Sequence, residues 1–344
     1  MDILSELNEQ KRKVDFNSYD ISVKELISMV EEGIINIAPE YQRQFRWKED
    51  RQSSLIESIF LGIPVPSLFM AANADGSWEL IDGVQRLSSI IHFAGNGTVK
   101  EKISSTSSLT LSNLDKLKNF NNKTFDTLPR SIQLDFLLKP LKITTLSDKS
   151  DLEVRFDLFE RLNTGGVVLT NQEIRSCVYR GKFNDFIKIL ATNDDFKTVV
   201  KLTATEEMDG TREEYVLRFF AFLNNYHNFD HSVVDFLNDY MSAATKNFNY
   251  ETSEKIFNET FKQLRPLPTG ITRNRNTTPA NLFEGVSVGA GLVIRDGKKI
   301  TIEGAEEWIA GAELRGYTTG ATNTRSKVVS RIEYCKRNFL RDDV

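Results

Sequence analysis

Hydrophobic and polar residues near the start of the chain follow first a helical pattern and then an extended one. Ser22 and Glu25 have capping-box spacing ahead of apolar residues at helical intervals, which predicts a helix over 23–32 that ends near Gly33. The following segment, 35–46, lacks this period and is predicted to be extended. The chain therefore begins with both kinds of secondary structure.

A strand, a glycine turn and a helix follow one another directly in the next segment. A helix capped by Asp50 precedes two apolar strands, 66–70 and 78–81, which an Asp-Gly pair joins in a tight reversal. The second strand runs into Asp82 and Gly83, and apolar residues at helical spacing continue beyond them. The pattern predicts that the chain changes from strand to helix at this glycine.

The next residues return to the sheet and then become helical. A polar stretch, 95–122, is predicted to be a surface excursion with little regular structure. A helix over 132–138 leads into a strand over 141–145, and helical spacing resumes over 151–162. Thr170 then begins another capping box, which predicts a further helix.

Long helical periods replace nearly all strand signals after Gly181, which places a domain boundary near residue 180. We therefore predict an α/β domain over 1–180 and a mainly helical domain over 181–344. The predicted helices cover 183–190, 212–224, 233–248 and 254–264, and a final amphipathic helix carries Val328, Ile332, Cys335 and Phe339 on one face.

The composition limits the class of protein. The 344 residues suffice for two domains, and 40% hydrophobic with 27% charged residues is typical of a globular chain. Cys177 and Cys335 offer neither a disulfide framework nor a zinc knuckle. Because no apolar run reaches the ~18 residues of a membrane span, we predict a cytoplasmic protein without a membrane partner. The net charge of −4 predicts that any polyanion site is confined to a local patch.

The residues from Asp82 to Arg86 have the local chemistry of a phosphate site. A helix start presents unpaired main-chain N–H groups, Gly83 lets an anion approach the backbone, and Arg86 can hold phosphate oxygens with its guanidinium fork. The alternative is an Asp-Gly cap that does nothing more than begin a helix.

A second candidate is the extended segment Pro39-Glu-Tyr-Gln-Arg-Gln-Phe-Arg-Trp47. Its arginines alternate with aromatic residues, a mixture that suits a base stacked on a ring and a phosphate held by guanidinium groups. A strand with its aromatic side chains in the core and its arginines paired with Glu49 and Asp50 would give the same pattern.

Together these segments resemble the family known as domain of unknown function 262, the amino-terminal domain of the GmrSD type IV restriction enzymes and related phage-defence proteins. The family's PxYQRxxxW segment is matched by residues 39–47, and its IDGQQRL turn by Ile81-Asp-Gly-Val-Gln-Arg-Leu87. A third block, Phe159-Glu-Arg-Leu-Asn-Thr-Gly-Gly166 followed by Leu169 and Gln172-Glu-Ile174, is also similar. The likeness covers about 20–180 and continues more weakly at 281–287 and in the last helix.

The resemblance implies a ParB/sulfiredoxin-like fold whose turn binds nucleotide phosphates and, in several relatives, hydrolyses NTP to regulate DNA restriction. Catalytic roles pass to Asp82, Gln85 and Arg86. Nucleotide or phosphate binding passes to Tyr41, Gln42, Arg43, Arg46, Gly83, Asn163 and Thr164. The chain departs from the family at Val84, where a glutamine is usual, so we expect binding to be kept and hydrolysis to be slow.

The third block also offers ligands for a metal ion. An oxygen of Glu160 or Asn163 could bind a nucleotide-bound Mg²⁺, which usually takes only one or two protein ligands. The same residues also fit a simple helix end with a left-handed glycine.

The second domain carries a concentration of positive charge. Between Arg325 and Arg341 six basic residues accompany one acid, Glu333, and the loop 262–276 holds basic residues and no acid. We predict a DNA-backbone surface there, with a solvated helix face as the alternative. Its residues would be Arg273, Arg275, Lys336 and Arg337.

These observations predict a nucleotide-binding sensor or regulatory subunit of a bacterial restriction or anti-phage defence system. Because no nuclease motif is present, such a subunit would need a separate effector protein, for example a nuclease. Two alternatives stand beside it: a non-enzymatic DNA-binding or adaptor module whose turn holds a backbone phosphate, and a stand-alone ParB-like nuclease.

Overall fold

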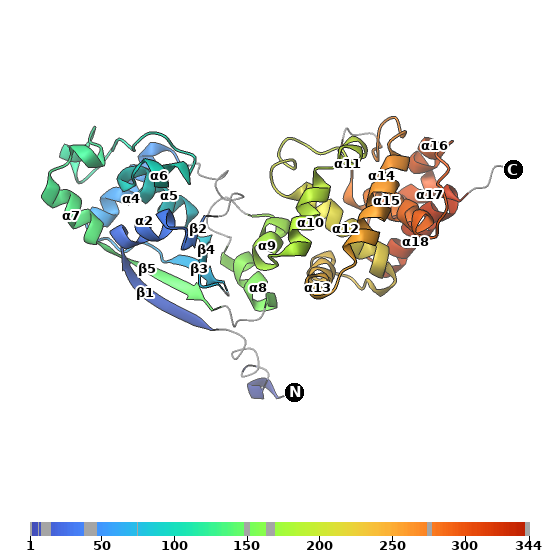
Figure 1. The fold of residues 1–344 in the computed structure, drawn as a ribbon, viewed down its shortest axis with the longest axis horizontal. Coiled ribbons are helices and arrows are strands. Elements are labelled where there is room, and N and C mark those ends of the chain that lie inside the picture. The colour runs from blue at the N-terminus through green and yellow to red at the C-terminus, as the bar shows by residue number, and fades with distance from the viewer. Residues whose placement is uncertain are drawn as a thin grey trace. The chain divides into compact units, whose positions relative to one another are not determined.

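The computed structural model describes residues 2–5, 7, 15–37, 47–73, 75–147, 152–162, 169–273 and 277–340. The chain forms two compact units, Met1–Val168 and Leu169–Val344. The first unit contains a sheet with helices and the second is helical (Figure 1). The predicted α/β class and the helical carboxy-terminal region are therefore confirmed.

The first unit is built on a five-stranded mixed sheet. Its strands are β1 (Phe16–Ser22), β2 (Ile35–Asn36), β3 (Leu68–Ala72), β4 (Trp78–Asp82) and β5 (Pro140–Leu146), in the order β1-β5-β3-β4-β2. β5 pairs antiparallel with β1 and parallel with β3, while β4 pairs antiparallel with β3 and parallel with β2. The predicted hairpin of β3 and β4 is confirmed, and β5 returns to the sheet as expected.

Helices cover one side of this sheet (Figure 1). They are α2 (Val23–Glu31), α4 (Glu49–Phe60), α5 (Val84–Ala94), α6 (Gly97–Glu101) and α7 (Arg130–Leu138), while α8 (Leu152–Leu162) packs against β4. Ser22 caps α2 as predicted, because its Oγ accepts a hydrogen bond from the N–H of Glu25 at 3.2 Å. Leu80 of β4 and Leu87 and Ile91 of α5 are fully buried between helix and sheet.

The predicted cap of α4 was wrong. The helix begins after Lys48, which makes no side-chain cap hydrogen bond, and Asp50 lies in its first turn. Asp50 Oδ1 instead accepts hydrogen bonds of 2.9 Å from Ser112 Oγ and from Asn113 Nδ2. The carboxylate therefore anchors a distant loop, which sequence spacing within the helix could not indicate.

The polar stretch 95–122 is also more ordered than predicted. It contains α6 and a short 3₁₀ helix over Lys118–Phe120. Leu109 and Leu111 are fully buried, and Glu57 Oε1 of α4 accepts hydrogen bonds from the N–H groups of Lys116 and Leu117. The few leucines and the carboxylate of α4 hold the stretch in place, although polar residues dominate its composition.

The second unit is a group of packed helices. They are α9 (Asn171–Val178), α10 (Lys182–Ala191), α11 (Asp194–Val199), α12 (Thr211–Asn225), α13 (Val233–Lys246), α14 (Tyr250–Leu264), α15 (Ala280–Arg295), α16 (Ala305–Ala310), α17 (Ala312–Thr318) and α18 (Arg325–Phe339). The predicted apolar face of the last helix is confirmed, since Val328, Ile332, Cys335 and Phe339 are fully buried. In the ranges described, no helix is both long and apolar enough to span a membrane.

A chain of buried ion pairs crosses the core of the second unit. Arg175 of α9 and Arg218 of α12 both bind Glu214, at 2.9 and 2.7 Å. Arg218 also pairs with Glu284 of α15, and Glu284 in turn pairs with Arg331 of α18. Arg175, Glu284 and Arg331 are each no more than 1% exposed. Four helices are thereby joined through charged groups, of which Glu214 and Arg218 keep a partial exposure of 20% and 14%.

The helix α9 belongs to the second unit. The predicted capping box is confirmed: Thr170 Oγ1 accepts from the N–H of Glu173, and Glu173 Oε2 accepts from the N–H of Thr170. Thr170 Oγ1 also donates to the carbonyl oxygen of Asp209 at 2.7 Å. With Arg175 bound to Glu214, these contacts fix α9 to α12 and place the division between the units at Val168 and Leu169, before the predicted boundary near 180.

Candidate functional site

The turn after β4 has the shape that the sequence predicts. Gly83 joins β4 to α5 with φ at +104°, a left-handed conformation that residues with a side chain rarely adopt. A Cβ at this position would lie 2.3 Å from Leu68 Cδ2 and 3.1 Å from Arg86 Nη2. Glycine is therefore required both by the backbone and by the space around it. Because the residue at the N-cap of α5 is a glycine, it offers no side-chain hydrogen bond to the first turn.

Arg86 lies one turn into α5 and is held from two sides. Its Nη2 donates to Asp82 Oδ2 at 2.7 Å and to the carbonyl oxygen of Ser67 at 3.2 Å. The Nε of Arg86 is buried and has no hydrogen-bond partner within the described part of the chain. The ion pair leaves Asp82 a third exposed. The turn thus combines a fixed guanidinium, a buried Nε donor without a partner among the described residues, and a helix start whose N-cap has no side chain.

Gln85 of the same turn contacts the end of the other motif. Its Oε1 accepts a hydrogen bond from the N–H of Trp47 at 3.1 Å. The carbonyl oxygen of Trp47 accepts from Gln52 Nε2 of α4 at 2.7 Å, and the guanidinium of Arg51 lies 4.2 Å from the centre of its indole ring. The two motifs, far apart in the sequence, therefore meet at Trp47.

His92 of α5 orients the amide of Gln52. The two side chains meet at 2.8 Å, between His92 Nδ1 and Gln52 Oε1. Because Gln52 donates from Nε2 to Trp47, its Oε1 is the acceptor, so the proton of neutral His92 lies on Nδ1. Burial lowers the pKa of His92, with the charge of Lys100 adding to the effect and that of Glu49 opposing it. The imidazole is therefore neutral at neutral pH.

Sequence reasoning missed Arg51, Gln52 and His92 as parts of this site. Gln52 is 3% exposed on α4. A polar residue that occupies a buried position of an amphipathic helix needs a hydrogen-bond partner, and this was the available signal. Its partners lie on other segments, which the spacing within α4 does not indicate.

Several predicted residues lie outside the described ranges: Tyr41, Gln42, Arg43, Arg46, Asn163, Thr164 and Arg275. Glu160 is exposed on α8, the helix that packs against β4. Within the described ranges, no group of three or more His, Cys, Asp or Glu side chains could hold a metal ion. Asp82 is the carboxylate in the turn that could approach a nucleotide-bound Mg²⁺. It is already paired with Arg86.

The predicted basic surface of the second unit is partly engaged in internal contacts. Lys336 pairs with Asp296 at 3.0 Å, and Arg273 Nε donates to the carbonyl oxygen of Ile309 at 3.2 Å. Burial lowers the pKa of Arg273. Arg337 is exposed. Of these predicted DNA contacts, Arg337 is the most available.

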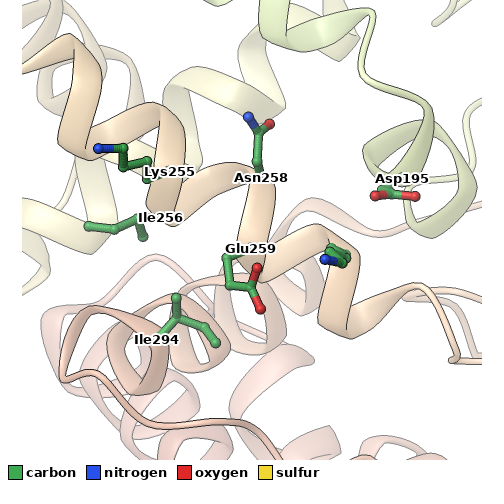
Figure 2. Close-up of a pocket in the computed structure, with 7 residues that line it drawn as sticks. Asp195, Lys255, Ile256, Asn258, Glu259 and Ile294 are labelled. Carbon is green, nitrogen blue, oxygen red and sulfur yellow. The ribbon is translucent and has the colours of Figure 1, made fainter.

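The second unit also contains an open groove of about 600 Å³ between α11, α14 and α15. Figure 2 shows Asp195 across the groove from Asn258 and Glu259 of α14. These polar groups are already engaged: Asp195 pairs with Arg265 at 2.6 Å, Asn258 accepts from Asn193, and Glu259 accepts from Gln263. The groove therefore offers few unused groups for a ligand.

Comparison with known protein families gives a match that covers most of the first unit and the start of the second. The family described as "GmrSD restriction endonuclease, N-terminal domain" matches residues 23–180. No curated protein and no solved structure matches the chain, so the ParB/sulfiredoxin-like comparison stays a prediction. The matched range contains the turn, Trp47 and α9. Residues 23–180 of this chain therefore belong to the family of GmrSD restriction endonuclease N-terminal domains.

Proposed function

We propose that this chain is a nucleotide-binding regulatory subunit of a restriction or defence system, with NTP phosphates bound at the start of α5. The family match supports a role related to restriction and defence. The observation that carries the nucleotide site is the left-handed Gly83, after which α5 begins without a side-chain cap from the described residues. Main-chain N–H groups at a helix start attract anions, and nucleotide-binding motifs place phosphate groups there.

Arg86 supplies the positive charge of the proposed site. Leaving a buried donor unpaired is costly, and a phosphate oxygen at the unused Nε would satisfy it. Asp82 holds the guanidinium in place through their 2.7 Å ion pair before the nucleotide arrives. Mg²⁺ would be held mainly by the phosphates, because Asp82 is already neutralised by Arg86.

Hydrolysis is proposed to be slow, and the subunit to act as a sensor for a separate effector such as a nuclease. Val84 has no polar side-chain atom that could orient a water molecule. The side-chain oxygen of Gln85 already accepts a hydrogen bond from Trp47. Val84→Gln should therefore raise the rate of phosphate release with little change in NTP affinity. Rapid release by the wild-type chain, abolished in Asp82→Ala, would contradict this part of the proposal.

Calorimetric titration of the full chain with the four NTPs, with and without Mg²⁺, tests the nucleotide site. Arg86→Ala should raise the dissociation constant by about 10- to 100-fold, because it removes a charge-assisted contact. The matched control is Arg130→Ala, since Arg130 is exposed in the same unit and contacts Gln133. Equal affinity in folded Arg86→Ala, or no binding by the wild type, would overturn the proposal. Salt-dependent DNA binding without a nucleotide effect would favour the DNA-binding alternative.

A further inference from the structure

The main chain of Trp47 is held on both sides by glutamine side chains. Gln85 accepts from its N–H at 3.1 Å, and Gln52 donates to its carbonyl oxygen at 2.7 Å. Arg51 covers its indole ring. Three side chains from two helices therefore fix Trp47, which ends the first motif just before α4 and contacts the first turn of α5 through Gln85.

We infer that Gln85 is a positioning residue that fixes Trp47, and that it acts on the nucleotide through this contact. The inference rests on the proposed nucleotide site. The side-chain oxygen of Gln85 accepts a hydrogen bond from a main-chain N–H group and so holds the backbone in place. An amide is also not basic enough to take a proton from water. Gln85 therefore leaves the set of catalytic residues that the family resemblance implied.

Gln52 allows an experiment to distinguish two roles of Gln85, which are positioning of Trp47 and direct contact with the nucleotide. It binds Trp47 from α4, and its other hydrogen bond goes to His92. The uncapped N–H groups and Arg86 belong to α5. If Trp47 is what matters, losing Gln52 should affect the nucleotide site as losing Gln85 does. If Gln85 touches the nucleotide directly, Gln52 should have little effect.

The first experiment measures the rate of hydrogen exchange at the main-chain amide of Trp47 and needs no nucleotide. Selective ¹⁵N-labelling of the three tryptophans gives main-chain signals for Trp47, Trp78 and Trp308, with Trp47 assigned from a Trp47→Phe variant. Gln85→Met should speed exchange of the Trp47 amide by about fivefold, the effect of one lost hydrogen bond. Gln85→Glu should keep its protection, because a carboxylate oxygen also accepts. The other two tryptophans should not change.

The matched control is Gln133→Met. Gln133 also ties main-chain carbonyls in the first unit, those of Phe125 and Leu128, but it has no bond to Trp47. It should leave exchange at Trp47 unchanged. An unprotected Trp47 amide in the wild type, or equal exchange in Gln85→Met, would overturn the inference whether or not the chain binds nucleotide.

The second experiment measures NTP affinity by calorimetry. Gln85→Met and Gln52→Met should each weaken binding about fivefold, and the double variant should lose about the same rather than about 25-fold, because both act through one residue. Arg51→Ala, an exposed change that cannot disturb the core, should weaken binding in the same direction. Gln133→Met should not.

The outcomes separate the two proposals. Additive losses of NTP affinity would refute the positioning role. An effect of Gln85→Met without any effect of Gln52→Met or Arg51→Ala would refute it as well, and would indicate that Gln85 contacts the nucleotide directly. A wild-type chain that binds no NTP would refute the proposed function, while the exchange of the Trp47 amide still decides whether Gln85 fixes Trp47.

Discussion

Glu284 of α15 joins two other helices in the core of the second unit through ion pairs. Its two oxygens bind Arg218 of α12 and Arg331 of α18, and it is 1% exposed on α15. We expect Glu284→Gln to be strongly destabilising. The amide keeps the shape of the carboxylate but removes the charge that two arginines share.

The magnitude follows from what remains around the arginines. Arg331 is fully buried and keeps the carbonyl oxygen of Thr322 at 2.8 Å, while Arg218 keeps Glu214. Removing one partner of a buried ion pair costs about 3–5 kcal/mol, because the other charge is left without water or counter-charge. For a domain of this size that corresponds to a fall in melting temperature of about 6–20 °C.

Urea unfolding of the full chain, followed by far-UV circular dichroism, measures this loss. The matched control is Glu251→Gln, because Glu251 forms an exposed ion pair with Lys255 at 2.7 Å, both side chains being more than 70% exposed. Its loss should change the free energy of unfolding by less than about 1 kcal/mol. A double variant, Glu284→Leu with Arg331→Met, should be more stable than Glu284→Gln, because no buried charge is left at Arg331. A loss below about 1 kcal/mol in Glu284→Gln would refute the reasoning.

Three further changes test other parts of the structure. Gly289→Ala should lower the free energy of unfolding in urea by about 1–3 kcal/mol, because a Cβ there would lie 2.7 Å from a side-chain carbon of α18, whereas Gly316→Ala, which meets open space, should not. Thermal melts should show stability falling as the pH drops below about 6.5, since burial lowers the pKa of His92 and the unfolded chain takes the proton first; an unchanged pH dependence in His92→Gln would argue against this. If the chain binds DNA, Arg337→Ala should reduce the slope of log affinity against log salt by about 0.9, measured by fluorescence anisotropy. Lys336→Ala should reduce it less, because its ammonium already pairs with an acid 3.0 Å away, and equal effects would contradict the assignment.

Local signals in the sequence were sufficient for much of the first unit. The cap at Ser22, the hairpin of β3 and β4 and the turn at Gly83 are each specified by residues close together in the chain. The long helix α15 was not predicted. It is apolar on nearly all sides and contains Gly285, Gly289 and Gly291, so it has neither an amphipathic period nor good helix formers. Packing against α18 decides its structure.

The candidate site was predicted in part for the same reason. Asp82, Gly83 and Arg86 form a local turn, and the sequence brings them together without help from the fold. The contact between Gln85 and Trp47 joins two segments that no local period relates. The sequence could not show that basic residues of the last helix have acidic partners. Glu284 lies on α15 and Asp296 at its end, and they pair with Arg331 and Lys336 of α18 only in the folded chain.

The family match extends past the first compact unit, and its last helix takes part in the ion chain. Arg175 belongs to the matched range 23–180 but is buried against Glu214 in the second unit. From Glu214 the ion pairs continue through Arg218 to Glu284 of α15 and Arg331 of α18. In an isolated piece of chain ending at 180, α9 would lose both Glu214 and the helices that bury it, so its apolar side chains would be left exposed to water. The matched residues from Leu169 onward therefore depend on the helical unit for their stability.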